Sequence, residues 1–358
     1  MNDLTKYFFD LLAISMGRER DFPVLDHDAW EHLFELAKKQ SLLGVMMAGL
    51  DALPRKGGAP LKYYSRWALM TEDIEKKSQA RLEAARSLYG RFADAGLRSC
   101  VLKGPSAAAR YPVPSRRQSG DIDIWVEGGT EKVMSFLRGI CPTRNIVYHH
   151  CDAKLVDGIS VEVHFTPSWM NSYVLNRRFQ RYCAQKQDGQ FSNFDGSLGF
   201  AVTDPEFAAV FSIVHIWRHV MDEGVGLRQL MDLHYLLEDL DEDRRTAAAA
   251  QLRRLGLGRF TAAVMFMLRE VFGLPEDRLL VPASQRGGAF LLDEILMAGN
   301  FGHFDTRIRR RGGESRGART VRKFCRDTRF FGFCPRDVLA APFFKLWQYC
   351  WRRRNGYL

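Results

Sequence analysis

The stretch Ser-Gly-Asp-Ile-Asp-Ile-Trp-Val (residues 119–126) alternates acidic and apolar residues with a period of two. This alternation predicts a β-strand in which Asp121 and Asp123 point to one face while Ile122 and Ile124 point into a core. Two neighbouring carboxylates repel each other unless a positive charge lies between them, and a divalent cation commonly supplies it. We therefore interpret this strand as the metal-holding part of an active site.

A glycine turn comes shortly before the acidic strand. The sequence predicts a short strand at 98–102, a tight turn at Lys103-Gly104-Pro105-Ser106 and the opening of a helix at 107–110, which two prolines then end. A turn that leads into a helix leaves backbone N–H groups free at the positive end of the helix dipole. A phosphate group can settle there, so the turn is a candidate phosphate site.

A third acidic residue follows the acidic strand. Residues 145–165 read as a pair of strands joined at Asp157-Gly158, a dipeptide that is common in tight hairpins. In the second strand, Glu162 and His164 alternate with apolar residues. If this strand neighbours the acidic one, Glu162 shares the polar face with Asp121 and Asp123.

The rest of the chain reads as mainly helical. Asp28 can cap a helix with a buried stripe of apolar residues, and Thr203-Asp204-Pro205-Glu206 has the features of a helix start, with Thr203 as the cap. Further helices are predicted at 42–50, 61–95, 130–139, 226–239, 241–254, 257–272, 318–330 and 336–354. An Arg- and Gly-rich stretch at 307–317 reads as a loop. We expect an α+β fold with a small mixed sheet flanked by helical regions.

Composition restricts the class of protein. The chain has 358 residues, of which 46% are apolar, so it is long enough for two or three domains with their own cores. We find no export-signal pattern and no uncharged run long enough to span a membrane, and we expect a cytoplasmic protein. The seven cysteines are scattered and never form a Cys-x-x-Cys pair, so we expect reduced thiols without a disulfide partner.

The positive charge of the chain is concentrated in its tail. Residues 301–358 hold 15 Lys and Arg against 4 Asp and Glu, a net charge of +11, whereas the first 300 residues carry a net charge of −1. Such a patch attracts phosphate-rich partners such as nucleotides, nucleic acid or anionic lipid. The last helix, which ends in Arg352-Arg353-Arg354, can lie on a membrane surface, but a helix docked on the protein explains the same residues and is our preferred interpretation.

The three carboxylates and the glycine turn fit metal-assisted nucleotidyl transfer. This reaction neutralises a triphosphate and places its α-phosphorus in line with an attacking hydroxyl, and two Mg²⁺ (or Mn²⁺) ions held by carboxylates can do both. Asp121 and Asp123 would hold both metal ions, and Glu162 would complete the second metal site and receive the acceptor's proton. Ser106 and the N–H groups after Gly104 would hold the β- and γ-phosphates.

These motifs together resemble the DNA polymerase β-like nucleotidyltransferase superfamily, which carries a glycine turn, an Asp-x-Asp strand and a third acidic residue on a following strand. Within it, the chain resembles the bacterial "uncharacterised nucleotidyltransferase" family. The residues that carry this resemblance are Leu102-Lys103-Gly104, Arg117, Gly120-Asp121-Ile122-Asp123, Val161-Glu162-Val163-His164 and Gly226-Leu227-Arg228-Gln229-Leu230-Met231-Asp232. The resemblance implies binding of ATP or another NTP and a small mixed sheet flanked by helices. Two departures concern the phosphate site: Pro105 removes one N–H donor, and the separation between Gly104 and Asp121 is longer than in compact members.

Several charged residues near the motifs allow two interpretations. Lys103 and Arg117 are either ordinary surface cations or ligands of phosphate. Arg228 and Asp232 form either a simple i, i+4 ion pair or, as the resemblance implies for Arg228, part of the substrate site. His164 shares a strand face with Glu162, where it can contact this metal ligand without itself binding the metal. His215 and His219, also at i and i+4, are better explained by packing than by zinc, because no third ligand is near in the sequence.

We predict four regions, which are an N-terminal helical region (1–95), a nucleotidyltransferase core (96–202), a helical bundle (203–300) and a basic helical tail (301–358). The predicted reaction moves an NMP group from an NTP to an acceptor hydroxyl. A protein, a small molecule and an RNA end all remain open as the acceptor. The alternatives are a metal-dependent glycosyltransferase that uses Asp-x-Asp and a catalytically silent nucleotide-binding interaction protein.

Overall fold

The computed structural model describes residues 3–54, 58–300 and 315–357. Most of these residues are helical, and the strands form one small mixed sheet and one short hairpin, so the predicted α+β class is confirmed. No helix within the described ranges is long and apolar enough to cross a membrane.

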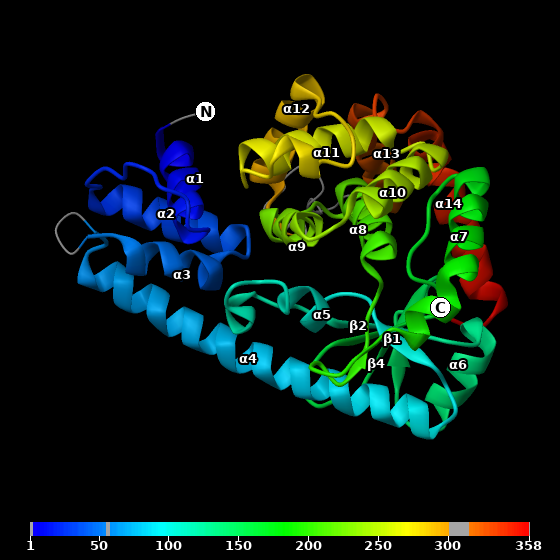
Figure 1. The fold of residues 1–358 in the computed structure, drawn as a ribbon. Coiled ribbons are helices and arrows are strands. Elements are labelled where there is room, and N and C mark those ends of the chain that lie inside the picture. Colours follow the sequence, from blue (N-terminus) through cyan, green and yellow to red (C-terminus); the bar gives the residue numbers. More distant parts are fainter. Residues whose placement is uncertain (1–2, 55–57, 301–314, 358) are drawn as a thin grey trace.

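The N-terminal region consists of helices, as predicted. They are α1 (Asp3–Ser15), α2 (His27–Lys39), α3 (Leu43–Ala52) and α4 (Leu61–Asp94). The predicted stripe of α2 is buried, but the cap is Asp26, whose side chain accepts a hydrogen bond from the Ala29 N–H, and not Asp28. The long helix α4 runs from α3 to the sheet and passes beneath α5 (Figure 1).

The central sheet has the strand order β1-β2-β5-β4-β3. Its strands are β1 (Ser99–Val101), β2 (Ile122–Val126), β3 (Thr143–Arg144), β4 (His150–Ala153) and β5 (Val161–His164). β2 and β5 are parallel, whereas β4 and β5 form the antiparallel hairpin predicted around Gly158. The sheet therefore places the Asp-x-Asp strand directly beside the strand that carries Glu162.

The two faces of β2 are buried in different cores. Ile122 and Ile124 pack into the core between the sheet, α4 and α6 (Gly129–Arg138). Trp125, on the opposite face with Asp123, packs against Phe191 and Phe207 in the larger helical core. The alternation of β2 is confirmed, but the acidic face is covered by helices and is not open to solvent as an ordinary strand face would be.

Helix α7 (Tyr173–Ser192) and the short strands β6 (Phe194–Asp195) and β7 (Phe200–Ala201) follow the sheet. Helix α7 was not predicted from the sequence, although Leu175, Phe179 and Cys183 form a buried stripe on it.

A bundle of helices covers the acidic face of the sheet. It contains α8 (Pro205–Asp222), α9 (Leu227–Glu238), α10 (Glu242–Arg254), α11 (Gly258–Glu270) and α12 (Gln285–Ala298). The cap of α8 is Asp204 and not Thr203, because the Asp204 carboxylate accepts a hydrogen bond from the Phe207 N–H. Helix α12 was not predicted; its first turn contains two glycines, which are typical of loops.

The tail packs on the bundle as α13 (Arg316–Asp327) and α14 (Pro335–Arg354), while most of the predicted loop at 307–317 lies outside the described residues. At the start of α14, the buried carboxylate of Asp337 accepts hydrogen bonds from the Ser172 N–H and the Trp217 indole. Farther along, Leu339, Phe343 and Leu346 are exposed, so this helix is docked on the protein only in part.

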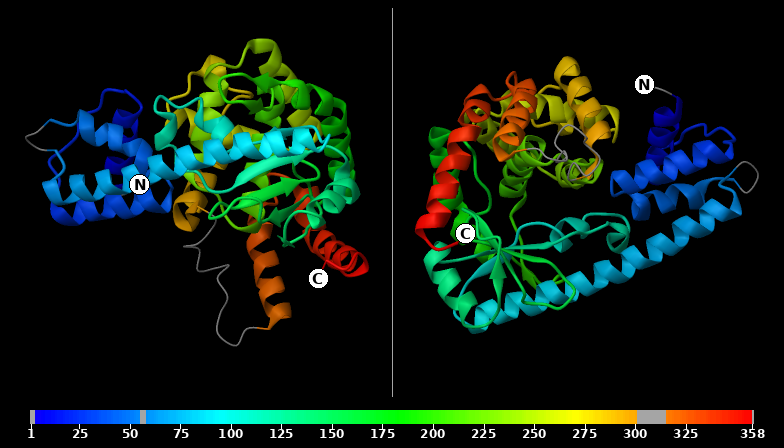
Figure 2. Two further views of the ribbon diagram at one scale, coloured as in Figure 1. Left: turned by 90° about the horizontal axis from the view of Figure 1, so that it is seen from below. Right: turned by 180° about the vertical axis from the view of Figure 1, so that it is seen from behind.

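The N-terminal helices also contact the bundle, which closes the chain around the site. Gln40 donates to the Ile295 carbonyl and accepts from the Leu227 N–H, and the Arg18 guanidinium donates to the Val271 carbonyl. Helix α4 and the sheet lie on one side of this arrangement and α8 to α12 on the other (Figures 1 and 2).

Candidate active site

A cavity of about 460 Å³ lies between the turn after β1, the start of β2 and helices α8 and α9. Nine of the predicted site residues line it: Lys103, Gly104, Ser106, Arg117, Gly120, Asp121, Asp123, Arg228 and Asp232. Glu162 and His164 lie beside Asp123 on the neighbouring strand, so the structure brings all the predicted residues into one region.

Asp123 is the most buried carboxylate of the site. Its side chain is 1% exposed, and its Oδ1 atom lies 3.1 Å from Lys103 Nζ and 3.1 Å from His164 Nε2. Its Oδ2 atom is buried and has no hydrogen-bond partner among the described residues. Burial alone would raise the pKa of Asp123, but Lys103 and the hydrogen bond from His164 outweigh it and hold the pKa well below its usual range. Asp123 is therefore ionised and has a free ligand atom.

Glu162 faces Asp123 directly across the parallel β2–β5 pair. Its Oε2 atom lies 3.4 Å from His164 Nε2, and Asp123, Glu162 and His164 place possible metal-ligand atoms within 4.8 Å of one another. Burial raises the pKa of Glu162 to about 7. Burial opposes the charged form of His164, but its hydrogen bonds to Asp123 and Glu162 raise its pKa to about 9.

Asp121 lies just before β2, at the wall of the cavity. It is half-buried and belongs to none of the possible metal-ligand groups found among the described residues. The turn that carries Gly104 packs closely on it, because a Cβ atom at Gly104 would lie 3.3 Å from the Asp121 carbonyl oxygen. Gly104 also has a φ of +80°, a conformation that side-chain-bearing residues rarely adopt.

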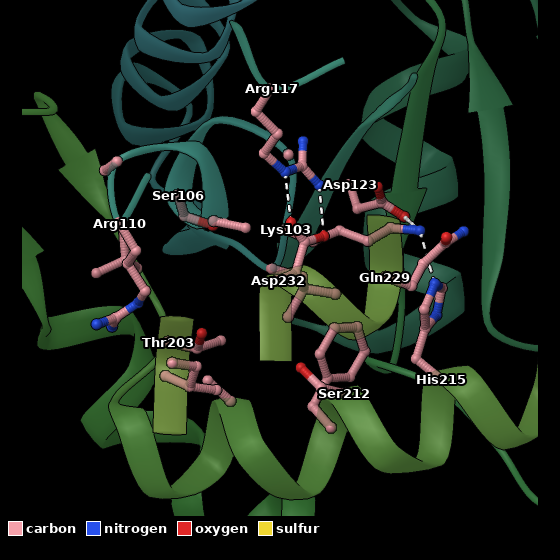
Figure 3. A pocket seen from close by; sticks show the side chains of 18 of the residues that line it. Lys103, Ser106, Arg110, Arg117, Asp123, Thr203, Ser212, His215, Gln229 and Asp232 are labelled. Carbon is pink, nitrogen blue, oxygen red and sulfur yellow. Dashed lines mark hydrogen bonds and ion pairs between the residues drawn. The ribbon is translucent and has the colours of Figure 1, made fainter. Parts of the chain in front are cut away.

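The helix after the glycine turn is shorter than its predicted role requires. Helix α5 (Pro105–Ala108) is a single turn with Pro105 at its first position. The prolines that follow end it, and one turn sums few peptide dipoles, so the predicted dipole site is weak. Ser106 nevertheless lines the cavity through its side chain, which Figure 3 shows beside that of Arg110.

Arg117 and Asp232 form a buried ion pair that the sequence interpretation did not include. Arg117 Nε and Nη2 each lie 2.7 Å from an oxygen of Asp232 (Figure 3). The Tyr111 hydroxyl donates to the same carboxylate at 2.6 Å. Burial opposes the charged form of Arg117, but Asp232 outweighs it and raises the pKa of Arg117. The Arg117 charge is therefore already balanced within the wall of the cavity.

Arg228 does not form the simple i, i+4 ion pair that its spacing from Asp232 suggested. Among the described residues no ion pair joins Arg228 to Asp232, because Arg117 occupies that carboxylate. Arg228 Nη1 instead donates to the Gln118 carbonyl at 2.7 Å, and its buried Nε has no hydrogen-bond partner in the described part of the chain. Arg228 therefore brings to the cavity wall a cation that has no hydrogen-bonded carboxylate among the described residues.

Comparison with known proteins gives one match. A family model described as "Uncharacterised nucleotidyltransferase" matches residues 26–273, which include the sheet, the cavity and most of the bundle. The chain belongs to this nucleotidyltransferase family. No curated protein and no solved structure matches the chain.

The sequence interpretation explained His215 and His219 by helix packing, but both histidines lie close to the site. His215 Nε2 lies 3.0 Å from Lys103 Nζ and 2.9 Å from His219 Nε2. Burial, followed by the charge of Lys103, holds the pKa of His215 well below its usual range. A neutral His215 accepts a hydrogen bond from the Lys103 ammonium group, and together with Asp123 it fixes this cation at the cavity wall (Figure 3). The i, i+4 spacing of the two histidines on α8 was visible in the sequence, but the contact of His215 with Lys103 was not.

Other residues in the cavity wall were not singled out from the sequence. Arg110, Ser212 and Thr203 line the side away from Asp123. Burial lowers the pKa of Arg110. These residues come from the segment after α5, the segment before α8 and α8 itself, and no short motif links them.

The carboxylates at and beside the cavity fit a divalent cation. The free, buried Oδ2 of Asp123 and the adjacent carboxylate of Glu162 supply the hard oxygen ligands that Mg²⁺ and Mn²⁺ prefer. Asp121 supplies a further carboxylate from the wall of the same cavity. The specific ion does not follow from these donors, because both cations accept oxygen ligands.

Proposed function

We propose that this chain moves an NMP group from an NTP to an acceptor hydroxyl with the help of two divalent cations. The observation that carries the proposal is the register of Asp123 and Glu162 across parallel strands, beside a cavity of about 460 Å³ with cationic walls. This volume is within the usual range of small-ligand sites. The family match supports nucleotidyl transfer in general, and the two-metal chemistry is our inference from the carboxylates.

In this proposal the carboxylates have distinct tasks. Asp121, Asp123 and Glu162 would hold two Mg²⁺ or Mn²⁺ ions, which when bound neutralise the triphosphate and acidify the acceptor hydroxyl. Glu162 would also accept the acceptor's proton, because its carboxylate lies beside Asp123 on the side from which the acceptor would approach.

The triphosphate would lie along the cationic wall of the cavity. Lys103 and Arg228 face it from the glycine turn and from α9, and Ser106 adds a hydroxyl donor. The buried Nε of Arg228 gains a hydrogen-bond partner when a phosphate oxygen binds, which offsets the cost of leaving it unpaired. Arg117, which the sequence suggested as a possible phosphate ligand, would instead stabilise the cavity wall through its ion pair with Asp232.

The acceptor would approach from the Glu162 side. Glu162 is not among the described residues that line the cavity, and its side chain is 24% exposed on the neighbouring strand. An NTP in the cavity and an acceptor above β5 would therefore meet at Asp123, from opposite sides. Protein, small-molecule and RNA acceptors are all compatible with this arrangement.

The test uses the full chain with each labelled NTP, Mg²⁺ or Mn²⁺ and a cell lysate. We expect metal-dependent pyrophosphate release and transfer of label to a lysate component. The Asp121→Ala plus Asp123→Ala variant should lose both, whereas Asp277→Ala, at an exposed carboxylate outside the cavity, should keep both.

Three outcomes would contradict the proposal. Pyrophosphate release that survives the double substitution would refute the assigned site. Turnover of a sugar nucleotide without turnover of any NTP would support a glycosyltransferase instead. Absence of metal-dependent nucleotide binding would leave only an interaction protein.

A further inference from the structure

We propose that His149, His150 and His164 form a binding site for a borderline transition-metal ion of the Zn²⁺ class, with Glu162 as a fourth ligand. This site lies on the acceptor side of Asp123 and adjoins the oxygen-ligand positions assigned above, because the two share Glu162 and His164 Nε2 lies 3.1 Å from Asp123 Oδ1. The inference rests on the placement of the imidazoles and does not depend on nucleotide transfer.

Backbone pairing holds the three histidines together. His150 on β4 is directly opposite His164 on the antiparallel strand β5. His149 immediately precedes β4, and its carbonyl oxygen accepts a hydrogen bond from the Phe165 N–H at 2.7 Å. The three imidazoles therefore converge because of the sheet register, and not because of a flexible loop.

The spacing of the nitrogen atoms suits one small cation. Possible ligand atoms of the three histidines all lie within 4.8 Å of one another. Glu162 Oε2 lies 3.7 Å from His150 Nδ1 and 3.4 Å from His164 Nε2. In a tetrahedral zinc site, two ligand atoms at the usual zinc distances lie about 3.4 Å from each other. The two separations from Glu162 Oε2 are close to this value. His149 Nε2 and His150 Nδ1 are closer, at 2.6 Å, and would separate slightly around an ion.

The surroundings hold two of the rings in place. The second nitrogen of His150, Nε2, lies 3.7 Å from Asp152 Oδ1, as expected for a metal-bound histidine whose other nitrogen faces a carboxylate. His149 packs on Trp169 with 3.9 Å between ring centroids, and the Arg218 guanidinium covers the same indole at 3.8 Å. This stacking restricts rotation of the His149 ring before any ion binds.

The ligand set determines the class of metal. Imidazole nitrogen suits zinc, copper, nickel and iron, whereas Mg²⁺ selects oxygen ligands in an octahedral shell. Three imidazoles and one carboxylate therefore favour Zn²⁺ or Co²⁺ over Mg²⁺. His150 is 15% exposed through its side chain, which leaves a path for an ion to enter. An ion here would also fix the carboxylate of Glu162, the residue proposed to receive the acceptor's proton.

The experiment measures metal binding by the full-length, EDTA-treated chain without nucleotide. Zn²⁺ is titrated by calorimetry, and Co²⁺ is followed by its visible absorption, which distinguishes tetrahedral sites from the hydrated ion. We expect one tight site per chain, resistant to millimolar Mg²⁺. Its Co²⁺ spectrum should lack a thiolate charge-transfer band, because the proposed ligands include no cysteine.

Variants connect the binding to these histidines. The His149→Ala plus His150→Ala variant should bind Zn²⁺ at least about 100-fold more weakly, whereas His32→Ala, at an exposed histidine on α2, should bind like the original chain. If the double variant does not fold, His150→Gln replaces it, with an expected loss of at least about tenfold. The melting temperature of the original chain should also rise with Zn²⁺.

Unchanged Zn²⁺ affinity in the histidine variants, or displacement of Zn²⁺ by Mg²⁺ at equal concentration, would overturn the inference. Nucleotide transfer without stoichiometric Zn²⁺ binding would refute this site alone. Zn²⁺ binding without NTP turnover would refute the proposed function alone.

Discussion

The buried ion pair between Arg117 and Asp232 gives the most quantitative stability prediction. Asp232→Asn keeps the size of the side chain but removes its charge, so the Arg117 guanidinium stays buried without a counter-ion. Arg117 is only 3% exposed through its side chain and makes two hydrogen bonds of 2.7 Å to this carboxylate. Removing one partner of such a pair costs about 3–5 kcal/mol. Because Asn retains one oxygen acceptor for Tyr111, we expect a loss near the lower end, about 3 kcal/mol.

Urea unfolding at pH 7, followed by circular dichroism, measures this loss. The midpoint should fall by about 1 M with an unchanged slope, since the slope for a chain of this size is about 3 kcal/mol/M or more. The exposed Asp277→Asn serves as the control and should shift the stability by less than about 0.5 kcal/mol. Replacing both partners, with Arg117→Met and Asp232→Leu, should restore part of the loss, because no unpaired charge remains.

The pH dependence has a definite sign. Burial opposes the ionised form of Asp232, but Arg117 outweighs it and lowers its pKa in the folded chain. A carboxylate with a lowered folded pKa stabilises the protein above its unfolded pKa of about 3.9, and this stabilisation disappears as the pH falls through the folded value. The difference in unfolding free energy between the original chain and the Asp232→Asn variant should thus be constant from about pH 5 to 8 and shrink below about pH 4. Two results would refute the reasoning. One is a loss of unfolding free energy smaller than about 0.5 kcal/mol at pH 7, and the other is a difference in unfolding free energy that grows on acidification.

Three further perturbations follow from the structure. Arg228→Met removes from the cavity wall a cation with an unpartnered Nε and should weaken NTP binding by about 10- to 100-fold in calorimetry, whereas the exposed Arg286→Met should not change it. Gly104→Ala should cost more unfolding free energy than Gly96→Ala, because both glycines have positive φ but only Gly104 would place a Cβ 3.3 Å from a carbonyl oxygen; equal losses would contradict this packing. Asp337→Ala leaves a buried backbone donor and an indole donor unpaired and should cost about 3 kcal/mol in urea unfolding, more than Asp337→Asn; equal effects would show that its hydrogen bonds contribute little.

Local alternation was enough to predict the centre of the site. The period-two pattern of β2 and β5 placed Asp123 and Glu162 on polar faces, and the structure pairs these two residues directly. Such a pattern depends only on neighbours in sequence and on the geometry of a strand. The predicted hairpin at Gly158 has the same local origin, and its glycine has a φ of +72°.

Long-range partners could not be predicted in this way. The expected pair of Arg228 and Asp232 used helix spacing alone, whereas the actual partner of Asp232 is Arg117, 115 positions earlier in the chain. The contact between Lys103 and His215 spans 112 positions and likewise depends on how α8 packs on the sheet. The three histidines near Glu162 required the register of β4 and β5, which sequence spacing did not supply.

Helix ends and irregular helices were the other source of error. The cap of α8 was predicted one residue too early, at Thr203 instead of Asp204, because the two polar residues are adjacent and local signals do not distinguish them. Helix α5 ends after one turn because of the prolines that follow it, which reduces the predicted phosphate site to side-chain donors such as Ser106. The boundaries of the four predicted regions remain predictions.

The central claim is that the carboxylate of Asp123 organises nucleotidyl transfer, and one measurement tests it most directly. Transfer of label from [α-³²P]NTP with Mg²⁺ is compared between the original chain, Asp123→Asn and the exposed control Asp277→Asn, after circular dichroism shows that all three are folded. We predict that Asp123→Asn loses at least about 100-fold in transfer rate while Asp277→Asn keeps it. A folded Asp123→Asn variant that transfers label at the original rate would contradict the account.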